Sequence, residues 1–377
     1  MNKKQIIQKI QHIKRRLTKR PFDSANILYL LTGFLAIISC CLIFWFTYQQ
    51  FVGRVTPGSL IDPNGGKNNE EPEDTRCEYM RVLDGVCVEK ESDTTGESIA
   101  IMVENHFEAN PLSGISDAAV VYEAPVEGHI PRLLAIYSAK ADVSQVGPVR
   151  SARPYYLDWV SEYGDAMYMH VGGSPEALEK IWAFDMFDMN EFSRGWYYWR
   201  SNTRRAPHNT YTSSNLWSQA LEKYGEEDMQ MLQKGWRFGD MEPCVEDCVS
   251  RIDIEQSVGG YDLAWEYDTL SEQYERTQFG KVHRDMGGSG YVADTILIQR
   301  VEATVVDGVG RLHIETIGEG DGYVFRNGYA IAATWKKDER TSRTRWFDEE
   351  EKEIALKPGK IWVQVVSQNG TVEVVVE

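Results

Sequence analysis

The sequence predicts an α+β protein in which an α/β domain precedes a mostly antiparallel β domain, both tethered outside a membrane by an N-terminal anchor. Three features support this fold class. Residues 98–235 alternate short apolar runs with segments of helical spacing, residues 251–377 alternate apolar with polar positions, and residues 27–48 contain no charged residue and no histidine.

Charge is distributed unevenly along the 377 residues. The chain has 40 Lys and Arg against 57 Asp and Glu, a net charge of -17, yet residues 1–20 carry eight basic residues and no acid. Binding of nucleic acid requires a basic face on the folded body, so we expect no nucleic-acid partner. The asymmetry indicates two compartments, with residues 1–26 as a basic cytoplasmic segment.

Residues 27–48 are the expected transmembrane anchor. A helix of 22 residues spans about 30 Å of hydrocarbon. The basic flank predicts a single-pass protein of the cell membrane with its N-terminus in the cytoplasm. In the alternative interpretation, residues 37–40 are a lipoprotein cleavage box and Cys40 carries a lipid after processing. Both interpretations place the body outside the cytoplasm.

Residues 49–97 are predicted to be a flexible stalk, because residues 54–76 are rich in Pro, Gly, Asn and acids and have little to bury. Four further cysteines fit an oxidising compartment, and we expect two local disulfides. These pairs are Cys77 with Cys87 and Cys244 with Cys248. A four-thiolate zinc site is the alternative, although neither pair has the usual two-residue spacer.

The elements of the two domains follow from local patterns. In the α/β domain, apolar runs predict strands at residues 98–105, 117–125, 131–139 and 166–173. One predicted helix opens at Ser174 and Pro175, and another runs over residues 213–224 to Gly225. In the β domain, alternation predicts strands within residues 295–306, 311–317, 322–335, 360–366 and 371–377. Gly-Glu-Gly, Asn-Gly and Pro-Gly turns divide these runs, with the Asn-Gly turn at residues 327 and 328.

The familiar catalytic motifs are absent. The sequence has no phosphate-binding loop, dinucleotide fingerprint, zinc-protease motif or serine-hydrolase elbow, so we expect no cofactor and predict no metal site. For a divalent metal, the acids Glu104, Glu123 and Glu127 are better candidates than the histidines.

The first candidate site is the turn around Ser151. Arg150 and Arg153 flank this residue, and two guanidinium groups three residues apart can converge on one phosphate or carboxylate. The alternative is that both arginines pair with acids such as Glu123 and Glu127.

The second candidate site follows the strand at residues 166–173. His170 ends the apolar run, and Gly172, Gly173 and Ser174 lead into a helix whose free N–H groups form an anion-binding concavity. The alternative is an ordinary capped turn with a hydrogen-bonded histidine.

The third candidate site is the stretch at residues 192–221, which contains four arginines, among them Arg204 and Arg205, and no acid. Its aromatic residues fit a stacked glycan, and its charge fits an anionic ligand. His208, beside Asn209, is with His170 a candidate catalytic acid or base. The alternative is a solvated loop over buried aromatics.

Five segments carry a family resemblance, in the order IAIMVEN, PLSGISDAAVVYEAPVEGHIPRLLAIY, VGPVRSARPYYLDWV, HVGGSPEAL and RRAPHNTYTSS. They resemble the YerB-like family of bacterial envelope proteins, a two-part domain of unknown function. The resemblance covers most of residues 98–220 and, more weakly, residues 283–366. It implies an envelope protein, since members are commonly described as lipoproteins, and it implies no reaction. The chain departs from the family in its apparent uncleaved anchor and its stalk with two cysteines.

By analogy, the turn before Arg150 is also similar to the LytR-CpsA-Psr phosphotransferases, whose arginines hold the pyrophosphate of a lipid-linked glycan. Those enzymes pair the arginine with an aspartate, whereas Ser151 stands here, which argues against transfer but not against anion binding. Three functions follow: a module that binds an anionic or glycan ligand, a phosphotransferase-like enzyme acting on lipid-linked glycan, and a scaffold that recruits a protein partner through β edges.

Overall fold

The structure is a computed structural model that describes residues 77–226, 228–255 and 260–377. The basic segment, the expected anchor, Cys40 and most of the predicted stalk lie outside these residues. Among the helices of the described residues, none has the length and apolar character needed to cross a membrane.

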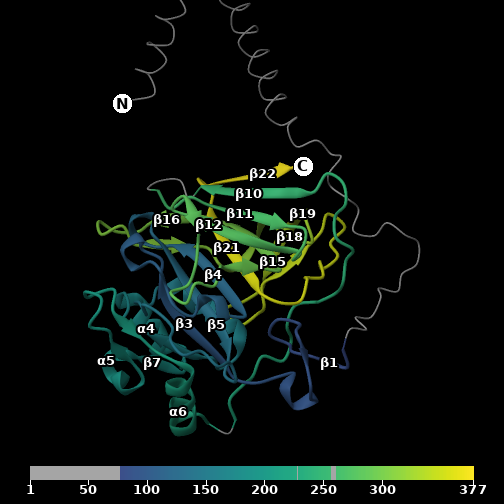
Figure 1. Cartoon of the computed structure of the whole chain (residues 1–377). Helices are drawn as coiled ribbons and strands as arrows, with labels where there is room; N and C mark the ends of the chain where they lie inside the picture. Colours follow the sequence, from purple (N-terminus) through teal and green to yellow (C-terminus); the bar gives the residue numbers. More distant parts are fainter. Residues whose placement is uncertain (1–76, 227, 256–259) are drawn as a thin grey trace, which may run out of the picture. The chain divides into compact units, whose positions relative to one another are not determined.

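A mixed sheet of ten strands forms the centre of the described chain (Figure 1). Its strands, in spatial order, are β20 (Arg345–Phe347), β19 (Tyr329–Lys337), β18 (Gly318–Arg326), β15 (Thr295–Val301), β21 (Ile361–Ser367), β4 (Val120–Pro125), β5 (Pro131–Ser138), β3 (Ser98–Glu104), β6 (Met167–His170) and β7 (Asp188–Asn190). Four neighbouring pairs are parallel, namely β15 with β21, β21 with β4, β3 with β6, and β6 with β7.

The two regions that the sequence separates contribute to this one sheet. Strand β21 lies parallel to β4, with Ile361 beside Val120 and Gln364 beside Glu123. The C-terminal region is mostly β structure, as expected, but five of its strands, β15, β18, β19, β20 and β21, extend the N-terminal sheet. Backbone hydrogen bonds therefore cross the expected domain boundary.

A second sheet of six strands comes from the C-terminal region. It contains, in order, β13 (Lys281–Val282), β12 (Gln273–Gln278), β11 (Leu263–Asp268), β10 (Val249–Glu255) and β22 (Thr371–Val376), with β14 (Val292–Ala293) on β12. Three short pairs complete the β structure: β1 (Tyr79–Met80) with β2 (Cys87–Val88), β8 (Trp199–Arg200) with β9 (Thr210–Tyr211), and β16 (Ala303–Val305) with β17 (Leu312–Ile314).

Within the part of the chain that the structure describes, helices are few and short. The α-helices are α3 (Pro154–Val160), α4 (Pro175–Ala183), α5 (Glu191–Arg194) and α6 (Ser214–Tyr224). The 3-10 helices are η1 (Glu91–Asp93), η2 (Phe107–Ala109), η3 (Ile115–Asp117), η4 (Glu127–His129), η5 (Ser161–Tyr163) and η6 (Gly195–Tyr197). The predicted start of α4 is confirmed, because Ser174 Oγ accepts the N–H of Ala177 at 3.3 Å.

The ten-stranded sheet separates two apolar cores. Strand β3 shows why, since all seven of its residues are buried and alternate between the cores: Ile99 and Ile101 face one core, and Ala100 and Met102 face the other. The first core also holds residues of β10, β11 and α6, whereas the second holds residues of α3. A strand covered on both sides has few places for polar groups, except at its ends.

Two local predictions are confirmed in detail. The hairpin between β18 and β19 turns at Asn327 and Gly328, both with positive φ, as a two-residue turn requires. Each cysteine pair forms its local disulfide, Cys77 with Cys87 and Cys244 with Cys248.

Candidate functional site

A cluster of charged side chains lies where β3 ends and β5 begins. Glu104 is the last residue of β3, and its register partner on β5 is Arg132. The turn that carries Arg150 joins the same edge, because the Arg150 N–H donates to the Met102 carbonyl at 2.8 Å. Segments distant in sequence thereby bring three arginines together at one end of the sheet.

Arg132 is the most unusual member of this cluster. Its side chain is 7% exposed, and its Nη1 donates to the Ser151 carbonyl at 2.5 Å. No carboxylate lies within ion-pair distance of it among the described residues. Burial, together with the positive charges of Arg153 and Arg150, lowers the pKa of Arg132 from 12.5 to about 10. No sequence pattern singles out Arg132, because an arginine at the start of a strand is normally solvated.

The two arginines predicted from the sequence do have carboxylate partners. Arg153 forms a two-pronged contact with Glu127, with nitrogen–oxygen distances of 2.7 and 2.8 Å. Burial would raise the pKa of Glu127, but the hydrogen bond and charge of Arg153 bring it below its usual value. Arg150 Nε lies 3.4 Å from Glu104 Oε1, and its Nη1 donates to a backbone carbonyl. Three arginines against two carboxylates leave the cluster with one uncompensated positive charge.

In the glycine turn after β6, other groups of the protein already form hydrogen bonds with the residues expected to bind an anion. His170 is fully buried, with Nδ1 2.7 Å from the Gly172 carbonyl and Nε2 2.8 Å from Asp188 Oδ1. Asn190 Oδ1 accepts the Gly172 N–H, and the Ala152 carbonyl accepts the N–H of Ser174. The N–H groups of Gly172 and Ser174 and the histidine therefore already have partners, as in an ordinary capped turn, and anion binding at Gly172, Gly173 and Ser174 stays a prediction.

The arginine-rich stretch is divided among several roles. Arg204 donates to the carbonyls of Ala109 and Pro111, so it holds the loop after β3. Arg205 is exposed, and Asn209 Nδ2 donates to a backbone carbonyl of its own loop. Of the residues in this stretch, His208 comes closest to the cluster, with Nδ1 2.8 Å from Glu104 Oε2.

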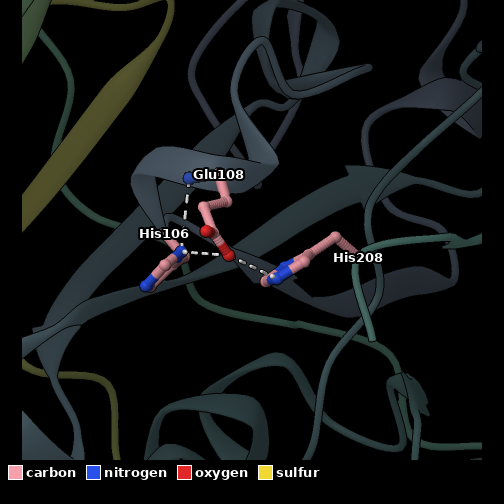
Figure 2. Close-up of side chains that lie close together, drawn as sticks. All are labelled: His106, Glu108 and His208. Atoms are coloured by element: carbon pink, nitrogen blue, oxygen red, sulfur yellow. Dashed lines mark hydrogen bonds and ion pairs between the residues drawn. The ribbon is translucent and has the colours of Figure 1, made fainter. Parts of the chain in front are cut away.

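His208 also faces a second histidine and a second carboxylate (Figure 2). Its Nε2 lies 3.4 Å from Glu108 Oε2, and the His106 ring stacks against its ring at 5.5 Å. The ligand atoms of His106, Glu108 and His208 all lie within 4.8 Å of one another. No spacing pattern in the sequence marks this group, because His208 lies about a hundred positions after the other two residues.

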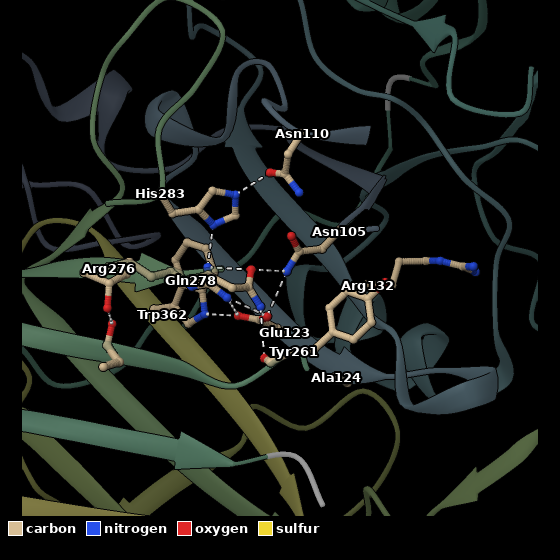
Figure 3. Close-up of polar contacts among 12 residues, drawn as sticks. Asn105, Asn110, Glu123, Ala124, Arg132, Tyr261, Arg276, Gln278, His283 and Trp362 are labelled. Carbon is tan, nitrogen blue, oxygen red and sulfur yellow. Dashed lines mark hydrogen bonds and ion pairs between the residues drawn. The ribbon is translucent and has the colours of Figure 1, made fainter. Parts of the chain in front are cut away.

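Glu123 belongs to a separate, enclosed polar network (Figure 3). Its two oxygens accept from Arg276 Nη2 at 2.7 and 2.8 Å, and the side chains of Asn105 and Trp362 also donate to it. Neither Glu123 nor Arg276 has exposed surface. The charge of Glu123 is thus already matched by Arg276 inside the core, and binding of a ligand or metal by Glu123 stays a prediction.

This network contains a histidine that stays neutral. Burial and the nearby charges of Arg276 and Lys281 lower the pKa of His283 to about 2. Its Nδ1 accepts from Arg276, and its Nε2 contacts Asn110 Oδ1 at 2.6 Å. The unfolded chain protonates this histidine near pH 6.5, whereas the folded chain does not, so its contribution to stability is complete above pH 6.5 and is lost as the pH falls.

We therefore expect acid to destabilise the protein less when His283 is replaced. Between pH 7.5 and pH 5, this group alone removes about 2 kcal/mol from the unfolding free energy of the native protein. Urea denaturation of the native chain and of His283→Gln at both pH values measures the difference. His313→Gln, at an exposed histidine, should keep the native pH dependence. An equal loss in native protein and His283→Gln would contradict the assignment.

A large cleft lies near the other end of α3. Its volume is about 820 Å³. Most residues of the segments 161–166, 184–187, 230–234 and 336–347 line it. Beside it, the Arg343 guanidinium lies between two rings, 3.5 Å from the Trp236 centroid and 4.4 Å from that of Tyr163. None of the sequence-predicted site residues lines this cleft, and its segments are too dispersed in sequence to form a motif.

Comparisons with known proteins agree with this architecture. Residues 83–228 match the family described as protein of unknown function (DUF3048) N-terminal domain, and residues 252–363 match the DUF3048 C-terminal domain. YerB of Bacillus subtilis (strain 168), described as a candidate lipoprotein, is 31% identical over 301 residues, which covers 78% of this chain and 88% of YerB. The crystal structure of the YerB protein from Bacillus subtilis superposes with a TM-score of 0.69 at 28% identity, over 78% of this chain and 99% of that one. The chain therefore belongs to the YerB-like family, a two-part domain family of unknown function.

Proposed function

We propose that the chain is an envelope-associated binding protein that holds an anionic ligand, such as the phosphate of a phosphorylated glycan, through Arg132, Arg150 and Arg153. The observation that carries this proposal is the buried Arg132 side chain without a carboxylate partner. A buried charge without a counter-charge is costly, and an anionic ligand would supply that counter-charge. Two disulfides and a relative described as a candidate lipoprotein support a position outside the cytoplasm.

The test is the thermal stability of the full-length chain with and without pyrophosphate. A ligand that binds only the folded state adds about 2.7 kcal/mol at one hundred times its dissociation constant, which raises the Tm of a chain of this length by roughly 4 °C. We expect this rise for the native protein and not for Arg150→Gln. Arg311→Gln, at a half-exposed arginine paired with Asp307, is the matched control and should behave as native.

Three outcomes decide between the proposal and its alternatives. An equal rise in native protein and Arg150→Gln would place the anion elsewhere and contradict the proposal. Release of lipid monophosphate from a lipid-linked pyrophosphoryl glycan, with the glycan phosphate passing to an acceptor hydroxyl, would favour the phosphotransferase-like function. A neutral glycan that stabilises the protein as well as pyrophosphate does would show that charge is not what the site recognises.

A further inference from the structure

We propose that His106, Glu108 and His208 form a binding site for one divalent transition metal ion, and that Zn²⁺ fits it best. This proposal goes beyond the anion-binding function and does not depend on it. Two of the residues flank the start of η2, just after β3, and the third lies in the loop between β8 and β9. Figure 2 shows the three side chains turned toward one another.

The distances suit a small ion. In a tetrahedral zinc site with bonds near 2.0 to 2.2 Å, two ligand atoms lie about 3.4 Å apart. Here Glu108 Oε2 lies 3.4 Å from His208 Nε2 and 4.0 Å from His106 Nδ1. The carboxylate oxygen therefore stands between two imidazole nitrogens at nearly ligand-to-ligand distance. All three ligand atoms lie within 4.8 Å of one another, so binding of the ion requires small rotations of both imidazole rings as well as of the Glu108 side chain, which is 60% exposed.

A second carboxylate orients His208 for this role. Glu104 Oε2 lies 2.8 Å from His208 Nδ1, and a carboxylate can only accept, so Nδ1 carries the proton. In the neutral ring, Nε2 then presents its lone pair to Glu108 and His106. Metal-binding histidines usually have such a partner, which fixes the tautomer and increases the basicity of the ligating nitrogen. Glu104 is itself held by Arg150, so the orientation is built into the fold.

His106 also presents a lone pair. Its Nδ1 accepts the backbone N–H of Glu108 at 3.2 Å, so this nitrogen is unprotonated in the structure. The ion would replace this hydrogen bond, and the freed N–H lies at an exposed residue, where water can satisfy it. The cost of forming the site is therefore small, and no buried group loses its partner.

The donor set selects the class of ion. Two imidazole nitrogens and one carboxylate oxygen suit Zn²⁺, whereas Ca²⁺ and Mg²⁺ prefer oxygen ligands alone. Three protein ligands leave a fourth position for water or another small ligand. Because Glu104 contacts both His208 and Arg150, this position belongs to the same edge of the sheet as the arginine cluster.

The test is calorimetric titration of the tag-free, full-length chain with Zn²⁺ after chelator treatment, in buffer without phosphate. We expect one ion per chain for the native protein and no response to Ca²⁺. Glu108→Gln and His208→Ala should each weaken Zn²⁺ binding at least about tenfold, a loss that even a change of a supporting residue produces. Co²⁺ should show the visible absorption of a four-coordinate ion in native protein and lose it in both variants.

The matched control is His313→Ala. His313 and Glu315 form an exposed histidine–carboxylate contact at 2.9 Å without a third ligand, so this variant should bind Zn²⁺ as native protein does. The proposal is overturned if native protein binds no Zn²⁺, or if Glu108→Gln and His208→Ala bind Zn²⁺ as tightly as native protein does. It is also overturned if His313→Ala abolishes Zn²⁺ binding. Glu108→Gln changes an exposed side chain, so a folding defect cannot produce its effect. The pyrophosphate experiment is separate, and either proposal can fail alone.

Discussion

Replacing Arg276 with methionine is expected to lower the unfolding free energy by about 3 to 5 kcal/mol, because it leaves the carboxylate of Glu123 buried without its counter-charge. Arg276 and Glu123 have no exposed surface, and they share two short hydrogen bonds. The amide of Asn105 and the indole of Trp362 also donate to this carboxylate, but neither carries a charge. The guanidinium is thus the group that makes an ionised Glu123 tolerable in the core.

Urea denaturation, followed by tryptophan fluorescence, measures this loss. The double variant Glu123→Leu with Arg276→Met should recover most of it, because two apolar side chains need no mutual compensation. Arg251→Met is the control, since Arg251 pairs with Asp253 on the exposed face of the same six-stranded sheet and should matter little. A single Arg276→Met variant as stable as native protein would contradict the assignment, as would a double variant whose loss equals the sum of two single losses.

Local chemistry made much of the fold predictable. The short, mostly apolar runs of β3, β15 and β21 mark strands wherever they pair, and the Asn327-Gly328 turn needs only two residues of positive φ. The start of α4 at Ser174 is equally local. The partner of each strand is not a local property. Nothing in the alternation of β21 indicates that it lies beside β4, more than two hundred residues earlier, so the shared sheet could not be predicted.

In the arginine cluster, too, some residues could be predicted from local sequence and others depend on contacts between distant segments. Arg150 and Arg153 could be predicted because they are neighbours in sequence, whereas Arg132 could not, because its burial depends on how β5 lies against the turn at Ser151. Glu123 had the strand position of a ligand-binding acid, yet its counter-charge arrives from β12 across the two sheets. Charge matching between distant elements decides which acids and bases are available to a ligand, and a sequence pattern does not contain it.

Arg132 and Arg276 are both buried arginines, and the same substitution should affect them in opposite ways. For Arg132, the fall in pKa from 12.5 to about 10 means that the charged form costs the fold about 3 kcal/mol. Both the folded and the unfolded chain carry this charge at pH 7, so the cost is fully present there and is relieved only as the pH rises above about 10. Arg132→Met removes the charge and keeps most of the buried stem.

We therefore expect Arg132→Met to be at least as stable as native protein at pH 7, and to lose the rise in Tm that pyrophosphate gives. The substitution removes one hydrogen bond to the Ser151 carbonyl, a loss of about 1 kcal/mol that the removed charge more than offsets. Thermal melts of native protein, Arg132→Met and Arg132→Lys, each with and without pyrophosphate, test both the expected stability and the expected loss of the response to pyrophosphate. Arg132→Lys keeps the charge and should keep part of the response.

The combination of outcomes identifies the role of the buried guanidinium. If Arg132→Met melts well below native protein, as Arg276→Met should, then Arg132 has a structural partner and the argument for an anionic ligand fails. If Arg132→Met is stable and still responds to pyrophosphate, the anion binds elsewhere. A stable variant without the response is the result expected when a protein keeps an unfavourable charge for a ligand, since stability in the empty state is then exchanged for affinity.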